Sequence, residues 1–447
     1  MSLVFKLLYW ISRTGSSLWY WSRRRFTVAG LCVAGGLLVA TPVAQDAENT
    51  VIFQAFSLLL AVLVPALAGL WFFRGKFAVT RRLPRLGTAG QPLAYYVTVS
   101  NLTAYPQRGL ALLEDLADPR PTYSEWLEYQ LAENRRIRPF RLEQRLRPNP
   151  FRPAIVQEGQ VPPLAPRGTE EVRMELTPLR RGALRFRALT LARSDPLGLF
   201  RAFIRVPAPQ TILILPRRYW LPPVALPGQM KYQAGGVALA ASVGRSEEFV
   251  ALRDYRRGDP QRHIHWRSWA KAGKPIVKEF EDEFFVRHAL VLDTFTAEPH
   301  SELLEEAVSV AASFACTALT QESLLDLLFV GTQSYCFTAG RGLAHTDQML
   351  EILASVRWCR DHPFAALESL VLNHVGRVSG CVCVLLAWDE PRRQLVEKLQ
   401  ALDVPLQVLV LVPPGAAAPD PGPLRTAPRR FHVLEMGKVA AGLARLD

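Results

Sequence analysis

Residues 247–280 read EEFVALRDYRRGDPQRHIHWRSWAKAGKPIVKEF, and the rest of the 447-residue chain is organised around this stretch. It mixes guanidinium, carboxylate, imidazole, phenol and indole groups, with few apolar runs. Such a mixture is costly to bury unless each polar group finds a partner. The stretch therefore predicts either a specified polar network or a surface that another molecule contacts.

Composition limits the classes of protein to which the chain can belong. With 447 residues, 49% of them hydrophobic, the chain has enough apolar material for two packed domains beside a membrane segment. A net charge of +13 suits nucleic acid or the anionic cytoplasmic face of a membrane, so charge alone does not separate them. The six cysteines lie in apolar segments without metal-type spacing, which predicts buried thiols in a reducing compartment.

Two apolar segments lie near the N-terminus. Residues 26–44 carry no charge, and residues 51–73 are equally uncharged. At about 1.5 Å of helix rise per residue, both are long enough to cross a hydrocarbon layer of roughly 30 Å. We predict a two-helix transmembrane hairpin over 26–73, after an interfacial N-terminus over 1–25. Basic residues flank the pair and its connector is acidic, so we expect a two-pass inner-membrane protein with both termini in the cytoplasm.

A twin-arginine export signal is the alternative interpretation of the N-terminus. The residues Ser22-Arg-Arg-Arg-Phe26 precede an apolar run, as in such signals. However, no good small-residue cleavage site follows, and a second apolar segment soon begins. Export requires no second segment, so the anchor is favoured.

Short alternating runs from residue 74 predict a β-sandwich over 74–215. Runs with a period of two residues occur at 93–100, 171–176 and 181–191, and 212–215 closes the domain. An insertion at about 115–159 is helical by pattern around 124–133 and then rich in arginine over 135–152. We interpret these arginines as a solvated face, with lipid headgroups and nucleic acid as the alternatives. No nucleic-acid-binding motif accompanies them.

Beyond a linker predicted at 216–244, the last part of the chain, 245–447, alternates between apolar strands and helices. Strands are predicted at 288–293, 324–330, 381–386 and 406–412, and helices at 301–319, 349–356 and 391–402. This alternation predicts a doubly wound α/β domain with a mostly parallel sheet. Cys381 and Cys383 share one strand face and are interpreted as core residues.

Many positions of the opening stretch, taken in order, resemble the signature of a known family. They are Glu248, Phe249, Leu252, Arg253, Tyr255, Gly258, Asp259, Arg262, Ile264, Trp266, Ala270, Lys278 and Glu279. With a strand ending at Asp293, they resemble the prokaryotic family called domain of unknown function 58. Residues 180–182 (RRG) and 195–200 (DPLGLF) resemble the region ahead of that signature. The resemblance implies a membrane-anchored protein with a von Willebrand factor A-like domain. It also implies an association with MoxR-type AAA+ ATPases and, in some cases, transglutaminase-like proteins.

The resemblance raises the question of a metal site. Factor A-like domains commonly hold a divalent cation through Asp-x-Ser-x-Ser at the end of the first strand, and hard oxygen ligands suit Mg²⁺ or Ca²⁺. Here the matching positions are Asp293, Phe295 and Ala297, while Thr294 lies one residue out of register. Asp389 ends a later strand and is expected to face Asp293 at the switch point of the sheet. We expect a degenerate site without a metal, and no other cofactor.

Within the signature, Asp259 followed by Pro260 predicts a short helix that runs towards Ala272 and stops at Gly273. Two roles remain open for the polar residues around it, a network that pins the segment onto the α/β sheet and a surface that docks a partner. Tyr255 and Trp266 are expected to supply buried area with a polar tip. The candidate residues are Glu248, Arg253, Tyr255, Gly258, Asp259, Arg262, Trp266, Lys278 and Glu279.

No motif for catalysis occurs in the chain. It contains no GxSxG, P-loop or HExxH pattern, and His263 with His265 lacks a third zinc ligand. We therefore predict a non-enzymatic, membrane-tethered adaptor whose factor A-like domain binds protein. The expected partners are a MoxR-type ATPase, membrane lipid and, as a further possibility, a transglutaminase-like protein. The alternatives are a hydrolase or transferase that uses Arg253, Asp259 and Arg262, and a nucleic-acid binder that uses the arginines at 135–152, although nucleic acid is not expected.

Overall fold

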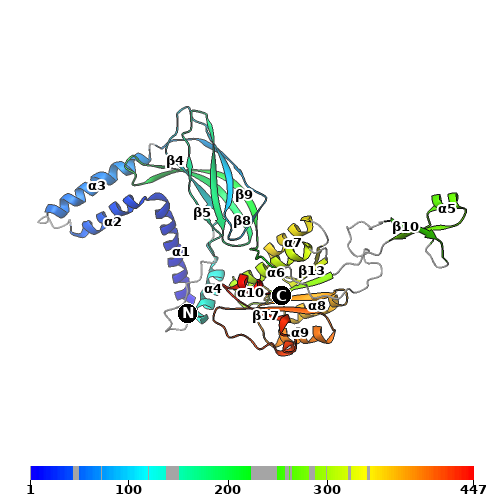
Figure 1. Cartoon of the computed structure of the whole chain (residues 1–447). Coiled ribbons are helices and arrows are strands. Elements are labelled where there is room, and N and C mark those ends of the chain that lie inside the picture. Colours follow the sequence, from blue (N-terminus) through cyan, green and yellow to red (C-terminus); the bar gives the residue numbers. More distant parts are fainter. Residues whose placement is uncertain are drawn as a thin grey trace. The chain divides into compact units, whose positions relative to one another are not determined.

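The computed structural model has a mixed α/β fold with several sheets (Figure 1). It describes residues 2–43, 50–71, 73–118, 120–136, 151–222, 249–256, 261, 264–280, 287–298, 300–320, 324–339 and 343–446. Two compact units are present, one formed by residues up to Arg217 and the other by most residues from Arg218 onwards.

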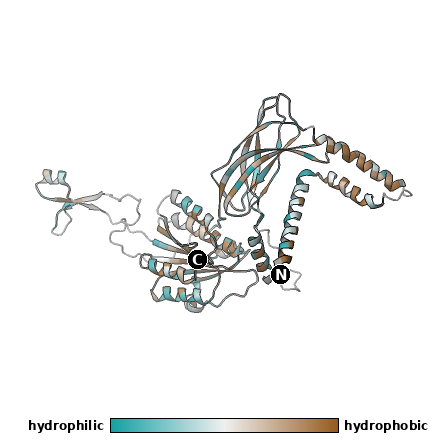
Figure 2. Ribbon diagram, turned by 180° about the vertical axis from the view of Figure 1, so that it is seen from behind, coloured by the Kyte–Doolittle hydropathy of each residue, from teal (hydrophilic) through white to brown (hydrophobic). Residues whose placement is uncertain are grey.

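Three helices open the first unit: α1 (Ser2–Arg25), α2 (Val28–Val43) and α3 (Thr50–Leu70). By length and composition, the segment Val51–Trp71 can cross a membrane, and α3 is coloured mostly as hydrophobic in Figure 2. The apolar part of α2 is shorter. The described chain thus contains one helix of membrane-spanning length and a shorter apolar helix beside it. The two-pass topology and the cytoplasmic termini stay predictions.

The first apolar helix starts later than residue 26, the predicted start of the first span. Phe26 forms an isolated antiparallel bridge with Phe200, and the N–H of Thr27 donates to the carbonyl of Leu199 at 3.0 Å. The N–H of Gly30 then donates to Thr27 Oγ1 at 3.1 Å, which caps the first turn of α2. From Val28 to Pro42 the helix rises roughly 21 Å, less than the hydrocarbon thickness of roughly 30 Å. The described helix thus begins two residues after the predicted start of the first span, and the predicted end at residue 44 lies outside the described residues.

The loop at 195–200, called here the docking loop, packs against the apolar helices. Asp195 shapes it, because its carboxylate accepts the N–H of Leu197 at 3.0 Å and the N–H of Phe200 at 2.6 Å. Thr27 Oγ1 donates to the carbonyl of Gly198 at 2.6 Å. The apolar part of the loop forms a cluster with the helices: Leu199 and Phe200 with Phe26, Val33, Val62, Leu63, Ala66 and Leu70. The loop therefore ties the sheets of this unit to α2 and α3.

Nine strands of the first unit form two sheets on one core. The strands are β1 (Phe77–Arg82), β2 (Leu86–Thr88), β3 (Leu93–Asn101), β4 (Leu110–Leu116), β5 (Ala154–Val156), β6 (Gly159–Val161), β7 (Thr169–Pro178), β8 (Gly182–Ser194) and β9 (Arg201–Leu215). The sheet orders are β1-β3-β7-β5 and β2-β9-β8-β4-β6. Alternation along β3 buries Tyr95, Val97 and Val99 in the shared core. The period-two runs predicted at 93–100, 171–176 and 181–191 are confirmed as strands.

One ion pair is buried in this core. The guanidinium of Arg81 lies 2.5 Å from the carboxylate of Glu114, and both side chains are fully buried. The hydroxyl of Tyr95 donates to the same carboxylate at 2.8 Å. Burial raises the pKa of Glu114, and the nearby charge of Arg81 lowers it only in part.

The insertion between β4 and β5 contains α4 (Tyr123–Arg136), which confirms the helix predicted around 124–133. The helix begins with a capping box, in which the N–H of Thr122 donates to Glu125 Oε2 at 2.8 Å. Most of the arginine-rich segment predicted at 135–152 lies outside the described residues.

The second unit is built on a six-stranded sheet. Its strands are β12 (Arg287–Leu292), β13 (Leu324–Val330), β14 (Ser334–Ala339), β15 (Gly380–Leu385), β16 (Leu406–Val412) and β17 (Phe431–Glu435), in the order β14-β13-β12-β15-β16-β17. Only β14 is antiparallel to its neighbour. The accompanying helices are α6 (Glu302–Thr320), α7 (Leu343–Ser355), α8 (Ala365–Val375), α9 (Glu390–Ala401) and α10 (Val439–Leu443), with short 3₁₀ turns η2 (Gly422–Leu424) and η3 (Pro428–Arg430). The mostly parallel sheet is confirmed, and its strand order reverses between β12 and β15.

The cysteines divide between core and surface. Cys381 and Cys383 are fully buried on the sheet face that packs against α8 and α9, so the prediction that they belong to the core is confirmed. The wider prediction of buried thiols is wrong for Cys32 and Cys336, which are exposed. Cys32 lies on the apolar helix α2, whose outer side has no protein partner in the described chain, and Cys336 lies on the edge strand β14.

The opening stretch forms a small β-hairpin with a helix, called here the signature hairpin. Strands β10 (Phe249–Asp254) and β11 (Ile276–Phe280) are antiparallel, and α5 (Trp266–Ala272) precedes β11. The helix stops at Gly273 as predicted, in a left-handed conformation with φ 67°. It does not begin near Pro260, because Ile264 pairs with Val277 and the N–H of His265 donates to the Ile276 carbonyl at 2.9 Å. Ile264 and His265 are therefore not part of the helix, which begins at Trp266.

Candidate functional site

The carboxylate of Asp293 lies at the point where the strand order of the six-stranded sheet reverses. Asp293 follows β12 and is fully buried. Its Oδ1 accepts the N–H of Phe295 at 2.9 Å, and its Oδ2 accepts the N–H of Leu386, just after β15, at 2.9 Å. One carboxylate thus joins the carboxyl ends of the two central strands, where open α/β sheets usually bind their ligands.

Arg392 is the cation that faces this carboxylate. It comes from the first turn of α9, and its Nε donates to Asp293 Oδ2 at 2.6 Å. One terminal nitrogen donates to Asp389 Oδ2 at 2.6 Å, and the other to the Phe295 carbonyl at 3.1 Å. The guanidinium also lies over the ring of Phe364, 4.9 Å from its centroid. Asp293 and Asp389 are therefore brought together by a side chain of the protein itself.

The environment keeps Arg392 charged. Burial disfavours its charged form, but the carboxylates of Asp293 and Asp389 outweigh burial and raise the pKa of Arg392 above its usual value. Asp389 also accepts the N–H of Arg392 at 3.4 Å as the N-cap of α9. The site is an ion cluster with one cation between two acids, of which Asp293 is buried and Asp389 is half exposed.

The residues at this end of the sheet do not fit a hard divalent cation. Such a cation takes about six oxygen ligands. Thr294 is fully buried and its hydroxyl donates to the Val330 carbonyl at 2.5 Å, so this hydroxyl is not positioned as a metal ligand. Among the described residues, no group of three or more His, Cys, Asp or Glu side chains is arranged to hold a metal ion. The guanidinium lies where a cation would have to contact Asp293.

Sequence reasoning missed Arg392 although a local signal was present. An acid follows an apolar strand, and a base comes three residues later in the first turn of a helix. Residues three apart at a helix start lie on the same side and can pair. This spacing joins Asp389 to Arg392. The link from Arg392 to Asp293 depends on the strand order, which a local pattern does not show.

The signature residues are only partly described. Glu248, Gly258, Asp259 and Arg262 lie outside the described residues, and so does the predicted network among Arg253, Asp259, Arg262 and Glu279. The backbones of Lys278 and Glu279 lie in β11, opposite Leu252 and Ala251 of β10. Arg253 is half-buried and donates to the Asp254 carbonyl at 3.2 Å, and half-buried Tyr255 donates its N–H to the Pro275 carbonyl at 3.0 Å.

Trp266 is more exposed than predicted. Its side chain was expected to be buried except for a polar tip, but the residue is 66% exposed. It opens the short helix α5, in which no residue is buried, and stacks on Trp269 with ring centroids 5.2 Å apart. Leu252 of β10 is exposed as well. The signature hairpin therefore presents aromatic and aliphatic surface to solvent.

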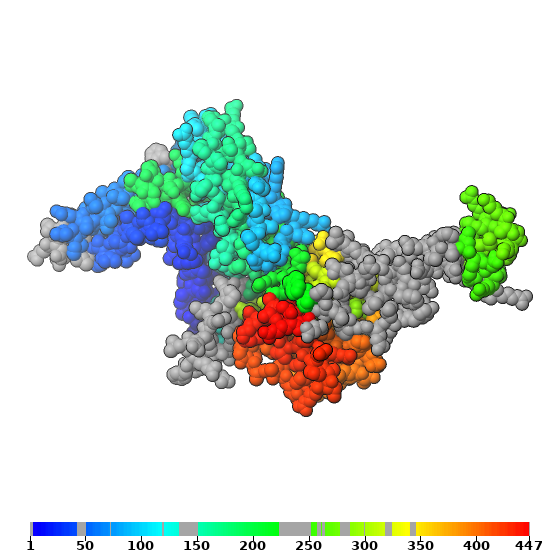
Figure 3. All heavy atoms as spheres, in the orientation of Figure 1, coloured from blue at the N-terminus to red at the C-terminus, as the bar shows by residue number. Residues whose placement is uncertain are grey.

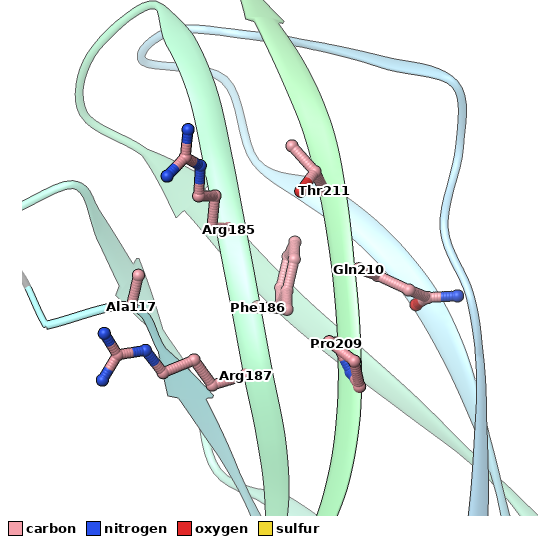
Figure 4. A pocket seen from close by; sticks show the side chains of 7 residues that line it. All are labelled: Ala117, Arg185, Phe186, Arg187, Pro209, Gln210 and Thr211. Carbon is pink, nitrogen blue, oxygen red and sulfur yellow. The ribbon is translucent and has the colours of Figure 1, made fainter.

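A shallow hollow lies on the first unit (Figure 4). Its volume is about 380 Å³ and its lining residues are Ala117, Arg185, Phe186, Arg187, Pro209, Gln210 and Thr211. It lies where the pairing of β8 with β9 is irregular, between Phe186 and Ala188. We interpret it as the result of this bulge, since its lining combines no acid with a base or nucleophile.

The described geometry can now be compared with known proteins. Residues 251–411 match the profile of the family described as Protein of unknown function DUF58. The matched range begins in β10 and ends in β16, so it includes the signature hairpin and the cluster of Asp293, Asp389 and Arg392.

Individual relatives are distant. The Uncharacterized protein YeaD of Bacillus subtilis (strain 168) is 26% identical over 184 residues, which cover 40% of this chain and 44% of that protein. The match thus spans less than half of the relative's length. Among solved structures, a CARDB domain from Pyrococcus furiosus is 11% identical, with 31% of this chain and 93% of that chain covered, at a TM-score of 0.16. Red sea bream transglutaminase is 14% identical, with 32% and 15% covered, at a TM-score of 0.17.

Proposed function

We propose that the protein is a membrane-anchored, non-enzymatic adaptor whose cytoplasmic von Willebrand factor A-like domain binds other proteins, with a MoxR-type AAA+ ATPase as its main partner. The observation that carries the proposal is the ion cluster of Arg392 with Asp293 and Asp389. The position at which doubly wound sheets bind small ligands is filled by the chain's own guanidinium. We therefore infer that this domain binds protein rather than a small ligand.

The strand order supports a factor A-like domain in this proposal. Counted along the chain from β12, the six strands lie in the order 3-2-1-4-5-6, with only the third antiparallel. The two apolar helices α2 and α3 serve as the anchor at an inner membrane, with both termini in the cytoplasm. Membrane lipid and a transglutaminase-like protein are the further partners proposed from the resemblance.

The signature hairpin is the proposed docking surface for the ATPase. Its exposed Trp266 stacks on Trp269, and exposed Arg267 and Lys271 lie in the same short helix. Tryptophan and arginine are the residue types that most often dominate the energy of protein interfaces. An exposed indole beside basic side chains suits an acidic partner surface with an apolar pocket.

Co-purification tests the proposal. The full-length protein is isolated from detergent-solubilised membranes, and the chains that remain bound are identified. We expect a MoxR-type ATPase with the wild type and a loss of at least tenfold with Trp266→Ala, because removing a hot-spot side chain costs about 2 kcal/mol or more. Asp259→Ala and Arg262→Ala probe the undescribed part of the signature in the same way.

Trp220→Ala is the matched control. Trp220 is 72% exposed and lies outside the signature hairpin, so its removal should leave the complex intact. An equal loss of bound ATPase with both variants would show that Trp266 has no specific role in binding it. A complex that survives every signature substitution, together with the loss of a catalytic turnover, would contradict the adaptor function.

A further inference from the structure

Helix α1 has two unlike sides. On one side, the ring of Tyr9 contacts those of Tyr123 and Trp126 of α4, with centroids 5.5 and 5.6 Å apart. Further along the same helix, Arg24 pairs with Asp115 at the end of β4. This side of α1 is thus fixed to the first unit at both ends of the helix.

The other side carries large exposed apolar residues, of which Trp21 also contacts Phe26, with ring centroids 5.9 Å apart. Counted along the chain they lie at spacings of three, four or seven residues, which places them along one face of a helix. They are Leu3, Leu7, Trp10, Ile11, Leu18 and Trp21, called here the apolar stripe, and all are exposed, from 49% for Trp21 to 81% for Leu3. At about 1.5 Å per residue, the helix that bears the stripe is roughly 36 Å long. Exposed apolar surface of this kind marks a binding site.

The charges of α1 indicate what covers the stripe. The helix contains no acidic residue, and Lys6, Arg13 and Arg23 are exposed along it. The guanidinium of Arg23 lies over the ring of Trp19, 4.6 Å from its centroid. Basic side chains beside tryptophan and leucine are typical of helices that lie in the plane of an anionic membrane surface.

The position of α1 in the first unit agrees with a membrane surface. The chain turns at Phe26 and Thr27 and continues directly into α2. In Figures 1 and 2, α4 lies on one side of α1, and α2 and α3 extend from the other. In the space-filling view, no other described segment covers that open side (Figure 3). The apolar stripe, opposite the Tyr9 contacts, therefore faces the side on which the apolar helices extend.

We propose that α1 lies flat on the anionic cytoplasmic leaflet, with the apolar stripe at the boundary between headgroups and acyl chains. This inference rests on the membrane anchoring in the proposed function. It assigns a lipid-binding role to α1 in addition to the anchor: α2 and α3 hold the protein in the bilayer, and α1 holds α4 and the strands beside it against the surface.

Quenching by brominated lipid tests the contact. The full-length protein is reconstituted in vesicles of equal parts phosphatidylcholine and phosphatidylglycerol with brominated acyl chains, which quench a nearby indole. We expect Trp10→Phe and Trp21→Phe each to lower the quenched fraction of tryptophan fluorescence, because both rings belong to the stripe. Trp220→Phe removes an exposed indole outside α1 and should not lower it. An unchanged quenched fraction in both stripe variants would overturn the inference.

Charge and self-association give two further outcomes. Reversing the exposed bases with Lys6→Glu and Arg23→Glu should lower the quenching of Trp10 and Trp21 in these vesicles more than it does in pure phosphatidylcholine. If Leu7→Cys instead forms a disulfide-linked dimer in high yield and Trp10 and Trp21 stay unquenched, a second copy covers the stripe and the lipid assignment is wrong.

Alkaline carbonate extraction of the membranes separates this inference from the proposed function. Release of the wild-type protein from the membrane would overturn the anchoring and, with it, the role of α1. Retention of the protein with unquenched Trp10 and Trp21 would overturn the role of α1 alone.

Discussion

The Nε atom of Arg392 lies 2.6 Å from Oδ2 of Asp293, and both side chains are almost completely buried. This single contact connects the end of β12 to the first turn of α9. Because Asp389 shares the guanidinium, one base is paired with two acids at the carboxyl end of the sheet. In other doubly wound domains this end of the sheet binds a ligand. Here its charged side chains bind one another.

Removing this cation should destabilise the second unit strongly. Arg392→Ala leaves the carboxylate of Asp293 buried without a charged partner, and breaking a buried pair on one side typically costs 3–5 kcal/mol. We expect a correspondingly lower denaturant midpoint for the full-length protein in detergent. Arg392→Lys should recover part of the loss, because an ammonium supplies charge but not the planar fork that reaches three acceptors.

Arg425→Ala provides the comparison for that experiment. Arg425 forms an exposed pair with Asp420, and such pairs contribute little to stability. A loss for Arg425→Ala as large as that for Arg392→Ala would contradict the special role of the buried cluster.

Chelation of divalent cations should leave the wild-type protein unchanged. Since Arg392 already occupies the side of Asp293 and Asp389 on which a cation would bind, neither EDTA nor added Mg²⁺ should shift the melting temperature. In Arg392→Ala the two carboxylates lose their cation, so added Mg²⁺ or Mn²⁺ should raise its melting temperature. A drop in the wild-type melting temperature with EDTA, reversed by Mg²⁺, would show that a cation does bind beside the guanidinium.

The packing of the docking loop against helix α2 can be tested by adding a methyl group to the helix. A methyl group added at Gly30 would clash with the backbone oxygen of Leu199, whereas one added at Gly35 would meet nothing within 4 Å. Gly30→Ala should therefore force the loop off the helix, at about 1–3 kcal/mol for overpacking. Hydrogen exchange should show faster exchange at residues 195–200 in this variant only. Equal protection of the loop in Gly30→Ala and Gly35→Ala would contradict the packing.

The buried pair of Arg81 and Glu114 predicts a pH dependence. Because the pKa of Glu114 is raised in the folded protein, the folded state holds this proton more tightly than the unfolded state. The resulting stability is fully present below the ordinary carboxyl pKa and is lost as pH rises through the raised value. The denaturation midpoint of the first unit should fall over that window in the wild type.

Glu114→Gln should remove this dependence, since the amide does not titrate. Arg81→Leu should shift the same window to higher pH, because Arg81 is the charge that lowers the pKa of Glu114. Identical pH profiles for the wild type and Glu114→Gln would show that another group is responsible.

The sequence predicted the parallel strands well, because each is a continuous apolar run that ends in a turn signal. The predicted run at 324–330 coincides with β13, and that at 406–412 with β16. The edge strands β14 and β17 were not predicted, since they are short and only partly buried, and their residues lack an apolar run.

The remaining differences come from contacts between residues distant in sequence. The start of α2 is set by Phe200, far along the chain from Phe26, and the strand order that brings Arg392 to Asp293 is likewise a property of the folded sheet. The same holds for Ile264, which looks helical beside Asp259 and Pro260 until Val277 pairs with it. Local patterns do not contain these pairings.

The docking loop has a mechanical consequence. Thr27 is hydrogen-bonded to Gly198 and Leu199, and Phe200 packs among side chains of both apolar helices. We therefore expect movements of the sheets to be coupled to movements of the helix pair. A partner that pulls on the strands would tilt the helices rather than extend a flexible linker. In the proposed membrane-anchored protein, force applied to the sheets would thereby reach the bilayer.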